Sequence, residues 1–265
     1  MALGWSGSVS AETLAEALAS AYTNNSDLNA ARAQVRAADE GVPQALSKWR
    51  PTITSSIDYS TQTGRSQGFN DWIAANNPRG VSLTIEQPLF VGMRTKNGVK
   101  MAHTAVLAAR EQLKSSEATV LLDAVQAFMS VVRAQVVLNL TAQNIEFLKE
   151  QVQSANDRLS VGEGTKTDVA QANSRLATGQ SDYDGAVADL NSAIAVYEQV
   201  IGHKPKNLGA SNGIHKLLPK TQEDGIAIAL RIHPEIVAAL YNIDIASYNV
   251  KIAEGSLLPT LAVEG

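Results

Sequence analysis

The sequence predicts a mainly α-helical fold with a small β part, built on a long coiled-coil hairpin that is joined to a pair of strands. Three observations predict it: a heptad-like run of apolar residues after Arg94, a change to alternating hydrophobicity after Pro51, and an internal repeat. The composition agrees, because a chain that is 45% hydrophobic but only 5% aromatic suits closely packed long helices.

The repeat aligns residues 14–53 with residues 222–261 without a gap. Ala30 falls on Ala238, Val42 on Val250, and the pairs extend to Pro51 and Pro259. The repeated unit is therefore a helix, a proline and a strand.

The second copy reaches Gly265 soon after its strand begins, so we expect one full repeat and the truncated start of another. The expected organisation is a remnant of a signal peptide or of an expression vector at 1–11, a first repeat at 12–202, an equatorial connection at 203–222, and the start of the second repeat at 223–265. The first repeat comprises a helix, a strand pair at 51–91 and a coiled-coil hairpin at 93–202.

The first helix is predicted over 12–48, with a break at the polar residues 23–27, where Ser26 or Asp27 caps the helix that follows. The equivalent position of the second copy holds Pro234, which suits the first turn of a helix.

The strand pair is predicted from period-two alternation. In the first strand Ile53, Ser55 and Ile57 share a face, and a Gly- and Asn-rich loop over 64–78 follows. The second strand has a more uniformly apolar face, formed by Val81, Leu83 and Ile85. Each run has about 10 residues, the length of a tilted transmembrane strand, although an ordinary soluble hairpin with one wet face has the same alternation.

The hairpin begins with a helix from Arg94 to Val161 that contains no proline. Its apolar seam has heptad-like spacing and comprises Ala124, Phe128, Val131, Gln135, Leu138, Ala142, Ile145, Leu148, Val152, Ala155 and Leu159. A turn follows, and a second helix returns to Gly202 with a seam of Val169, Ala172, Leu176, Tyr183, Val187, Leu190, Ile194, Tyr197 and Ile201.

Several classes of function lack support. The net charge is −4 and no basic stripe exists, which argues against nucleic acid binding. The chain has no cysteine, its four histidines lack the spacing of metal ligands, and no catalytic constellation is found, so we expect neither a cofactor nor an enzyme. No apolar run approaches the ~20 residues of a transmembrane helix, so we expect none.

Four segments resemble the outer membrane efflux protein family of TolC-like outer membrane channels. They are RPTI at 50–53, SLTIEQPLFVG at 82–92, RLSVGEGTKTDVAQANSRL at 158–176, and AVYEQVIG ending at Gly202. The resemblance implies two repeats per chain and a homotrimer when full length, with a twelve-stranded transmembrane β-barrel in the bacterial outer membrane and a helical tunnel across the periplasm. The expected partners are a periplasmic adaptor (membrane fusion) protein, an inner-membrane pump and outer membrane lipid.

The resemblance also implies sites. The helix tip, which would bind the adaptor and gate the entrance, comprises Val161, Gly162, Glu163, Gly164, Thr165, Thr167 and Asp168. Thr167 and Asp168 match a pair that holds the entrance shut in the family, and capping of the returning helix by either residue is the alternative role. Glu163 stands where the family commonly has an apolar residue. The membrane-facing strand residues are Val81, Leu83, Ile85, Leu89 and Phe90.

The predicted function is a passive exit duct for efflux or type I secretion of drugs, toxins or proteins. A soluble coiled-coil periplasmic scaffold or adaptor is the alternative, and it differs in needing no wholly apolar strand face.

Overall fold

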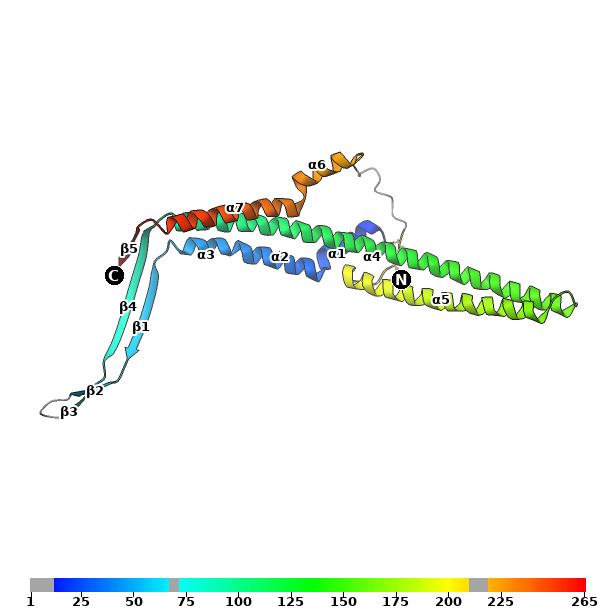
Figure 1. Cartoon of the computed structure of the whole chain (residues 1–265), viewed down its shortest axis with the longest axis horizontal. Coiled ribbons are helices and arrows are strands. Elements are labelled where there is room, and N and C mark those ends of the chain that lie inside the picture. Colours follow the sequence, from blue (N-terminus) through cyan, green and yellow to red (C-terminus); the bar gives the residue numbers. More distant parts are fainter. Residues whose placement is uncertain (1–11, 67–71, 210–218) are drawn as a thin grey trace, which may run out of the picture. The chain divides into compact units, whose positions relative to one another are not determined.

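The computed structural model describes residues 12–66, 72–209 and 219–265 (Figure 1). The expected remnant at 1–11 and residues 210–218 of the equatorial connection lie outside these ranges. The elements in chain order are α1 (Leu14–Asn24), α2 (Ser26–Asp39), α3 (Gly41–Ser47), β1 (Thr52–Tyr59), β2 (Gln62–Ser66), β3 (Trp72–Asn76), β4 (Arg79–Val91), α4 (Arg94–Ser160), α5 (Lys166–Ile201), α6 (Gln222–Ile232), α7 (Pro234–Gly255) and β5 (Thr260–Glu264).

The chain forms two compact units. The first comprises Met1–Arg32 and Leu113–Ala227, and the second comprises Ala33–Gln112 and Ile228–Gly265.

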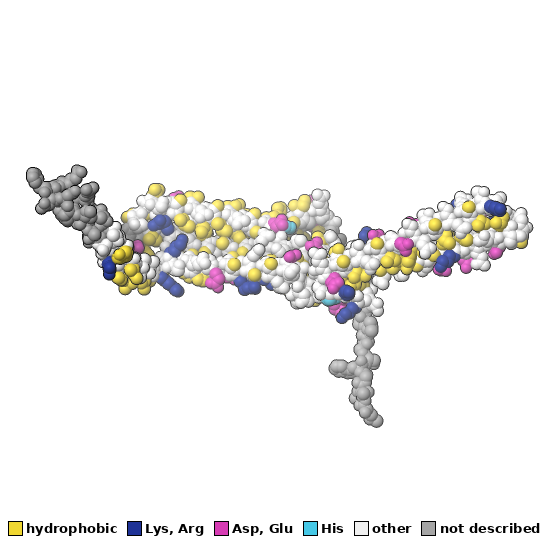
Figure 2. All heavy atoms as spheres, turned by 90° about the horizontal axis from the view of Figure 1, so that it is seen from below, with side chains coloured by type: hydrophobic (Ala, Val, Ile, Leu, Met, Phe, Trp, Pro, Cys, Tyr) yellow, Lys and Arg dark blue, Asp and Glu magenta, His cyan; other side chains and the backbone are white. Residues whose placement is uncertain are grey.

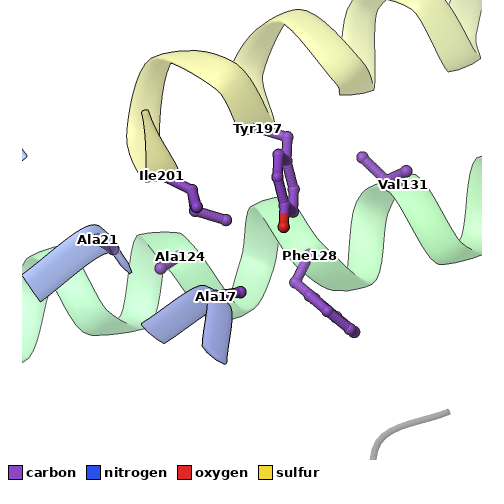
Figure 3. Packing of buried hydrophobic residues seen from close by; sticks show 7 residues of the cluster. All are labelled: Ala17, Ala21, Ala124, Phe128, Val131, Tyr197 and Ile201. Atoms are coloured by element: carbon purple, nitrogen blue, oxygen red, sulfur yellow. The ribbon is translucent and has the colours of Figure 1, made fainter. Parts of the chain in front are cut away.

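The core of the first unit lies where α1 packs against the hairpin of α4 and α5 (Figure 3). Its buried members are Ala17, Ala21, Ala124, Phe128, Val131, Tyr197 and Ile201. Three of these residues are alanines, whose small side chains let α1 approach the two long helices closely. Phe128 and Tyr197 are the largest fully buried side chains of this core, and Tyr197 points from α5 toward α4.

The burial of residues in the hairpin of α4 and α5 confirms most of the predicted apolar seam. On α4 every predicted seam residue is buried or half-buried except Gln135, which is exposed, and every predicted seam residue of α5 is buried or half-buried. Gly179 of α5 is also buried, and a Cβ atom there would lie 2.5 Å from Cδ1 of Leu148. The two helices are therefore in close contact at Gly179, which the heptad pattern did not identify.

The internal repeat reappears in the element bounds. α1 and α6 begin at Leu14 and Gln222, and β1 and β5 begin at Thr52 and Thr260, so each start is displaced by the same 208 residues. The helix breaks also correspond, because Asn25 and His233 both have extended backbone angles. As predicted, Pro234 occupies the first turn of α7.

The predicted cap at the first break was wrong. The side chain of Asn25, rather than that of Ser26 or Asp27, caps α2: its Oδ1 accepts hydrogen bonds from the backbone N–H groups of Asp27 (2.9 Å) and Leu28 (3.1 Å). Asn25 precedes the helix and can therefore accept from its free N–H groups, whereas Ser26 and Asp27 already belong to it.

The second unit contains a three-stranded antiparallel sheet with the order β1-β4-β5. The predicted loop over 64–78 was wrong in part, because β2 and β3 pair with each other as a separate two-stranded ladder. Backbone pairing joins the polar β2 to the largely apolar β3, and neither strand has the alternation on which the prediction depended.

The described residues include one helix, α4, that by length and composition alone could cross a membrane: an 18-residue window has a mean hydropathy of 1.5, and 28% of that window is buried. The bent pair of α6 and α7 passes the same test. The expectation of no such helix is wrong on this measure, because a window average tolerates isolated charges that interrupt an apolar run. Some apolar residues of α4 pack inside the protein, because Phe128 and Val131 lie buried in the hairpin core.

Candidate functional site

The turn that joins α4 to α5 is the part of the hairpin with the most specialised backbone. Gly162 has a φ of 84°, in the left-handed region that favours glycine after a helix. The N–H groups of Glu163 and Gly164 both donate to the Arg158 carbonyl oxygen, at 2.9 and 3.1 Å. These bonds satisfy the end of α4 and reverse the chain within a few residues.

A capping box begins α5. Thr165 is the N-cap, and its hydroxyl oxygen accepts from the backbone N–H of Asp168 at 3.2 Å. In return, Oδ2 of Asp168 accepts from the backbone N–H of Thr165 at 2.9 Å and from its hydroxyl at 2.7 Å. The expectation that Thr167 or Asp168 is itself the cap was therefore wrong: Thr165 caps, and Asp168 completes the box from the third helical position.

The electrostatics of the turn follow from this box. The hydroxyl of Thr165 lowers the pKa of Asp168 most, its backbone N–H contributes next, and the positive charge of Arg158 adds a smaller effect. Asp168 is fully exposed, so its carboxylate is ionised at neutral pH and open to a partner.

Other side chains of the turn point to solvent without a partner of their own. Val161 is 70% exposed, so the turn adds an apolar side chain to the surface. Glu163 and Thr167 are exposed, and neither side chain makes a hydrogen bond or an ion pair within the described residues. Beside the turn lies an open pocket of about 350 Å³, whose charged lining comprises Arg158, Glu163, Asp168 and Arg175. The tip thus presents charged and apolar groups at its surface.

The sheet carries the second group of predicted site residues. The register pairs Ile57 with Val81, Ser55 with Leu83 and Ile53 with Ile85. These six residues therefore share one face, where Val81 is 80% exposed. The opposite face is polar, and the hydroxyl oxygens of Ser56 and Ser82 lie 2.7 Å apart there.

An irregularity in β4 extends the apolar face. Gln87 pairs with Val263 and Phe90 with Leu261, so β4 accommodates one extra residue and the register shifts between Pro88 and Phe90. After this bulge Phe90 lies on the same face as Gln87, although simple alternation would place it on the other. Leu89 is the extra residue, and its side chain is exposed.

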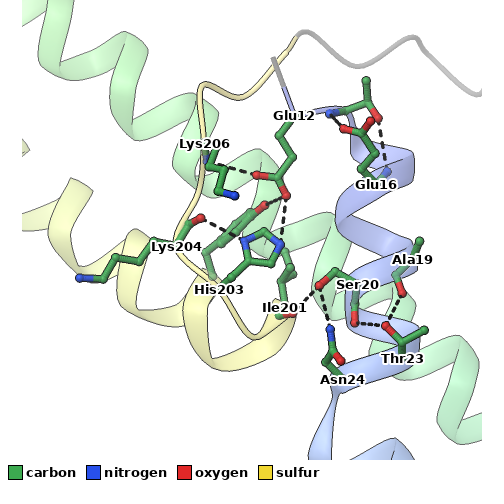
Figure 4. Close-up of polar contacts among 12 residues, drawn as sticks. Glu12, Glu16, Ala19, Ser20, Thr23, Asn24, Ile201, His203, Lys204 and Lys206 are labelled. Atoms are coloured by element: carbon green, nitrogen blue, oxygen red, sulfur yellow. Dashed lines mark hydrogen bonds and ion pairs between the residues drawn. The ribbon is translucent and has the colours of Figure 1, made fainter. Parts of the chain in front are cut away.

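A buried polar cluster in the first unit was not predicted (Figure 4). Glu12 is only 8% exposed, and its carboxylate accepts from the Tyr197 hydroxyl at 2.8 Å and from the Lys206 backbone N–H at 3.1 Å. Nε2 of His203 lies 3.4 Å from the same carboxylate. Burial, followed by the bond to Glu12, raises the pKa of Tyr197 well above its ordinary value of 10.0, so the hydroxyl stays a donor.

This cluster fixes the start of the first unit. The backbone of Glu12 donates to the carbonyl oxygen of Asn207 at 3.0 Å and accepts from the N–H of Gly209 at 2.9 Å. The seam pattern had identified Tyr197 only as an apolar residue, and nothing in the sequence linked it to Glu12. Within the ranges that the structure describes, no group of three or more His, Asp or Glu side chains is placed to hold a metal ion.

The fold and these sites define a class: proteins in which a long helical hairpin continues into antiparallel strands with one apolar face. The chain belongs to the outer membrane efflux protein family, which it matches over residues 17–203. This family consists of channel and transport proteins, and membership locates the chain in the bacterial outer membrane, with its helical part in the periplasm.

Individual relatives support this family membership. The outer membrane efflux protein BepC of Brucella suis biovar 1 (strain 1330) is 40% identical over 95% of this chain and 54% of its own length. The outer membrane protein TolC of Escherichia coli (strain K12) is 25% identical over 97% of this chain and 52% of its own length. The chain thus spans about half the length of these relatives.

Solved structures share the fold. The CmeC outer membrane channel of Campylobacter jejuni has a TM-score of 0.78 at 18% identity, covering 99% of this chain and 60% of that one. The outer-membrane channel OprN has a TM-score of 0.74 at 22% identity, covering 95% of this chain and 57% of that one.

Proposed function

We propose that the full-length protein is a passive, homotrimeric exit duct for efflux or type I secretion. The observation that carries the proposal is the union, in one chain of this family, of a long helical hairpin with an antiparallel sheet whose apolar face is exposed. A soluble scaffold would have to leave this face in water, where it would be unfavourable.

The unpaired edges of the sheet favour closure into a barrel. β1 and β5 are the outer strands of the described sheet, so each has one row of backbone groups without a partner. Hydrocarbon offers no hydrogen bonds, and strands in a membrane must therefore close into a barrel. We infer that strands of the rest of the protein and of two further copies complete it, with Val81, Leu83, Ile85, Leu89 and Phe90 facing lipid.

The helix tip supports a partner at the periplasmic entrance. The exposed side chains of Val161, Glu163, Thr167 and Asp168 are accessible for contacts with a periplasmic adaptor protein, which would connect the duct to an inner-membrane pump. The Asp168 carboxylate is also suited to accept a charge-assisted hydrogen bond from a neighbouring helix. Opening would then consist of breaking contacts at the tips. No chemical step is required of the protein, and the energy for transport comes from the pump.

The oligomeric state of the full-length protein tests this proposal. In detergent we expect a mass of three protein chains by light scattering with refractive-index correction. A folded monomer that stays in solution without detergent would favour the scaffold and overturn the duct.

A further inference from the structure

The junction between strands and helices in the second unit combines exposed basic and aromatic side chains. We define the junction patch as Lys48, Trp49, Arg50, Phe90, Met93 and Lys96. The first three lie between α3 and β1, and the others lie where β4 passes into α4. A pocket of about 160 Å³ connects the two groups, since its lining includes Trp49, Phe90, Met93 and Lys96.

No ion pair neutralises the basic side chains of this patch within the described residues. The chain as a whole has a net charge of −4, yet no Asp or Glu occurs in residues 41–57 or 87–110. The side chains of Lys48, Arg50 and Lys96 are exposed, and none makes a hydrogen bond or an ion pair within the described part of the chain. Figure 2 shows Lys and Arg side chains on the helical surface beside the strands. The patch therefore presents free cations to whatever adjoins it.

The internal repeat shows that the local backbone does not need these residues. Lys48, Trp49 and Arg50 correspond to Ser256, Leu257 and Leu258. The N–H of Trp49 donates to Leu46 at 3.0 Å, and the N–H of Leu257 donates to Glu254 at 3.1 Å, so equivalent residues make the same turn. Two basic residues and a tryptophan are thus not required to pass from helix to strand.

The apolar members indicate what lies beside the cations. Trp49 is 51% exposed, and its carbonyl oxygen accepts from Nε2 of Gln87 at 3.0 Å, which ties it to β4. Leu89 and Met93 are also exposed. Tryptophan with an apolar body and a polar N–H is typical of the boundary between hydrocarbon and water, and free Lys and Arg at that depth attract anionic headgroups.

We propose that the junction patch binds the headgroup of an anionic phospholipid in the periplasmic leaflet of the outer membrane. Lys48, Arg50 and Lys96 hold the phosphate, and Trp49 with Phe90 packs against the upper part of the acyl chains. The inference rests on the proposed function, because only strands that cross the membrane bring this junction to the level of the headgroups.

The test titrates the purified full-length protein in detergent with phosphatidylglycerol or phosphatidylethanolamine of identical acyl chains, and counts bound lipid by native mass spectrometry. Wild type should prefer phosphatidylglycerol. Because each basic residue near a membrane surface contributes about fivefold in affinity, the double variant Lys48→Ser/Arg50→Leu should bind phosphatidylglycerol roughly 25-fold more weakly. These replacements resemble the second repeat, and Lys96→Gln provides an independent variant should the double variant fail to fold.

The matched control, Arg133→Gln/Lys204→Gln, removes two exposed cations of the first unit and should leave the preference unchanged. Equal binding of both lipids by wild type, or equal loss in the control, would overturn the proposal. Competition by millimolar inorganic phosphate as effective as the lipid would show a phosphate site instead. A trimeric, conducting protein without lipid preference refutes this inference alone, whereas a protein that forms no trimer refutes the duct itself.

Discussion

Thr165 and Asp168 bond reciprocally at the start of α5, each through its side chain to the backbone N–H of the other, at 3.2 and 2.9 Å. The same carboxylate that completes the capping box is fully exposed at the tip of the hairpin. One residue can thus serve both the folding of the turn and a contact with another helix.

The structure predicts that the side chain of Thr165, and not that of Thr167, stabilises the turn. Thr165→Ala removes the oxygen that accepts from Asp168 and should cost about 1 kcal/mol in the free energy of unfolding. Thr167→Ala removes a side chain without a bond within the described residues and should change it little. Urea unfolding of both variants checks this, and equal losses would show that the capping assignment is wrong.

Asp168→Asn separates capping from gating. The amide oxygen can still accept from the Thr165 N–H, but the charge that a neighbouring helix would use is gone. If Asp168 gates, the full-length variant should conduct more than wild type with little change in melting temperature. Unchanged conductance would leave Asp168 with its capping role only.

The contribution of the Asp168 charge to folding stability should depend on pH. Its pKa in the folded protein lies below the ordinary value of 3.8, so the ionised form favours folding. This contribution is fully present above pH 3.8 and is lost as the pH falls through the lower, folded value. The small stability difference between wild type and Asp168→Asn at neutral pH should therefore shrink further below pH 3.8. A difference independent of pH would exclude the charge as its cause.

Substitution by Asp should destabilise the hairpin at buried seam positions but not at exposed positions. Val131 is 2% exposed, so Val131→Asp buries an unpaired carboxylate and should cost several kcal/mol. Leu138→Asp, at a half-buried position, should also destabilise the hairpin. Gln126→Asp and Glu150→Asp lie on the exposed side and should be nearly silent. Similar melting temperatures in the two pairs would contradict the register.

Gly179 and Gly185 form a matched pair on α5. Gly179→Ala places a methyl group against Cδ1 of Leu148, which must move aside, so the cost of this repacking should offset the gain in helix propensity. Gly185→Ala meets nothing within 4 Å and should stabilise the helix by roughly 0.5–1 kcal/mol. Thermal unfolding distinguishes them, and an equal gain at both positions would contradict the close contact at Gly179.

Regular periodicity made much of the fold predictable. The seam of α4 and α5 was correct at residues such as Phe128 and Ile145 because every heptad repeats the same constraint. The starts of α6, α7 and β5 followed from the repeat. Gln135 was misjudged because spacing alone cannot show that a polar residue leaves the seam.

The parts that the sequence did not reveal depend on single contacts. Asn25 and Thr165 cap because of where each helix begins, and helix starts are uncertain by a residue or two. Glu12 meets Tyr197 across 185 positions of sequence, a contact that no local pattern encodes. The assignments of the tip to an adaptor and of the strand face to lipid remain predictions.

Electrical recording tests the central claim most directly. Full-length protein reconstituted into planar lipid bilayers should give discrete, stable single-channel currents, because a closed barrel continued by a helical tunnel forms a water-filled path. Folded, trimeric protein that inserts into the bilayer but passes no current, even in an Asp168→Asn variant, would contradict the account.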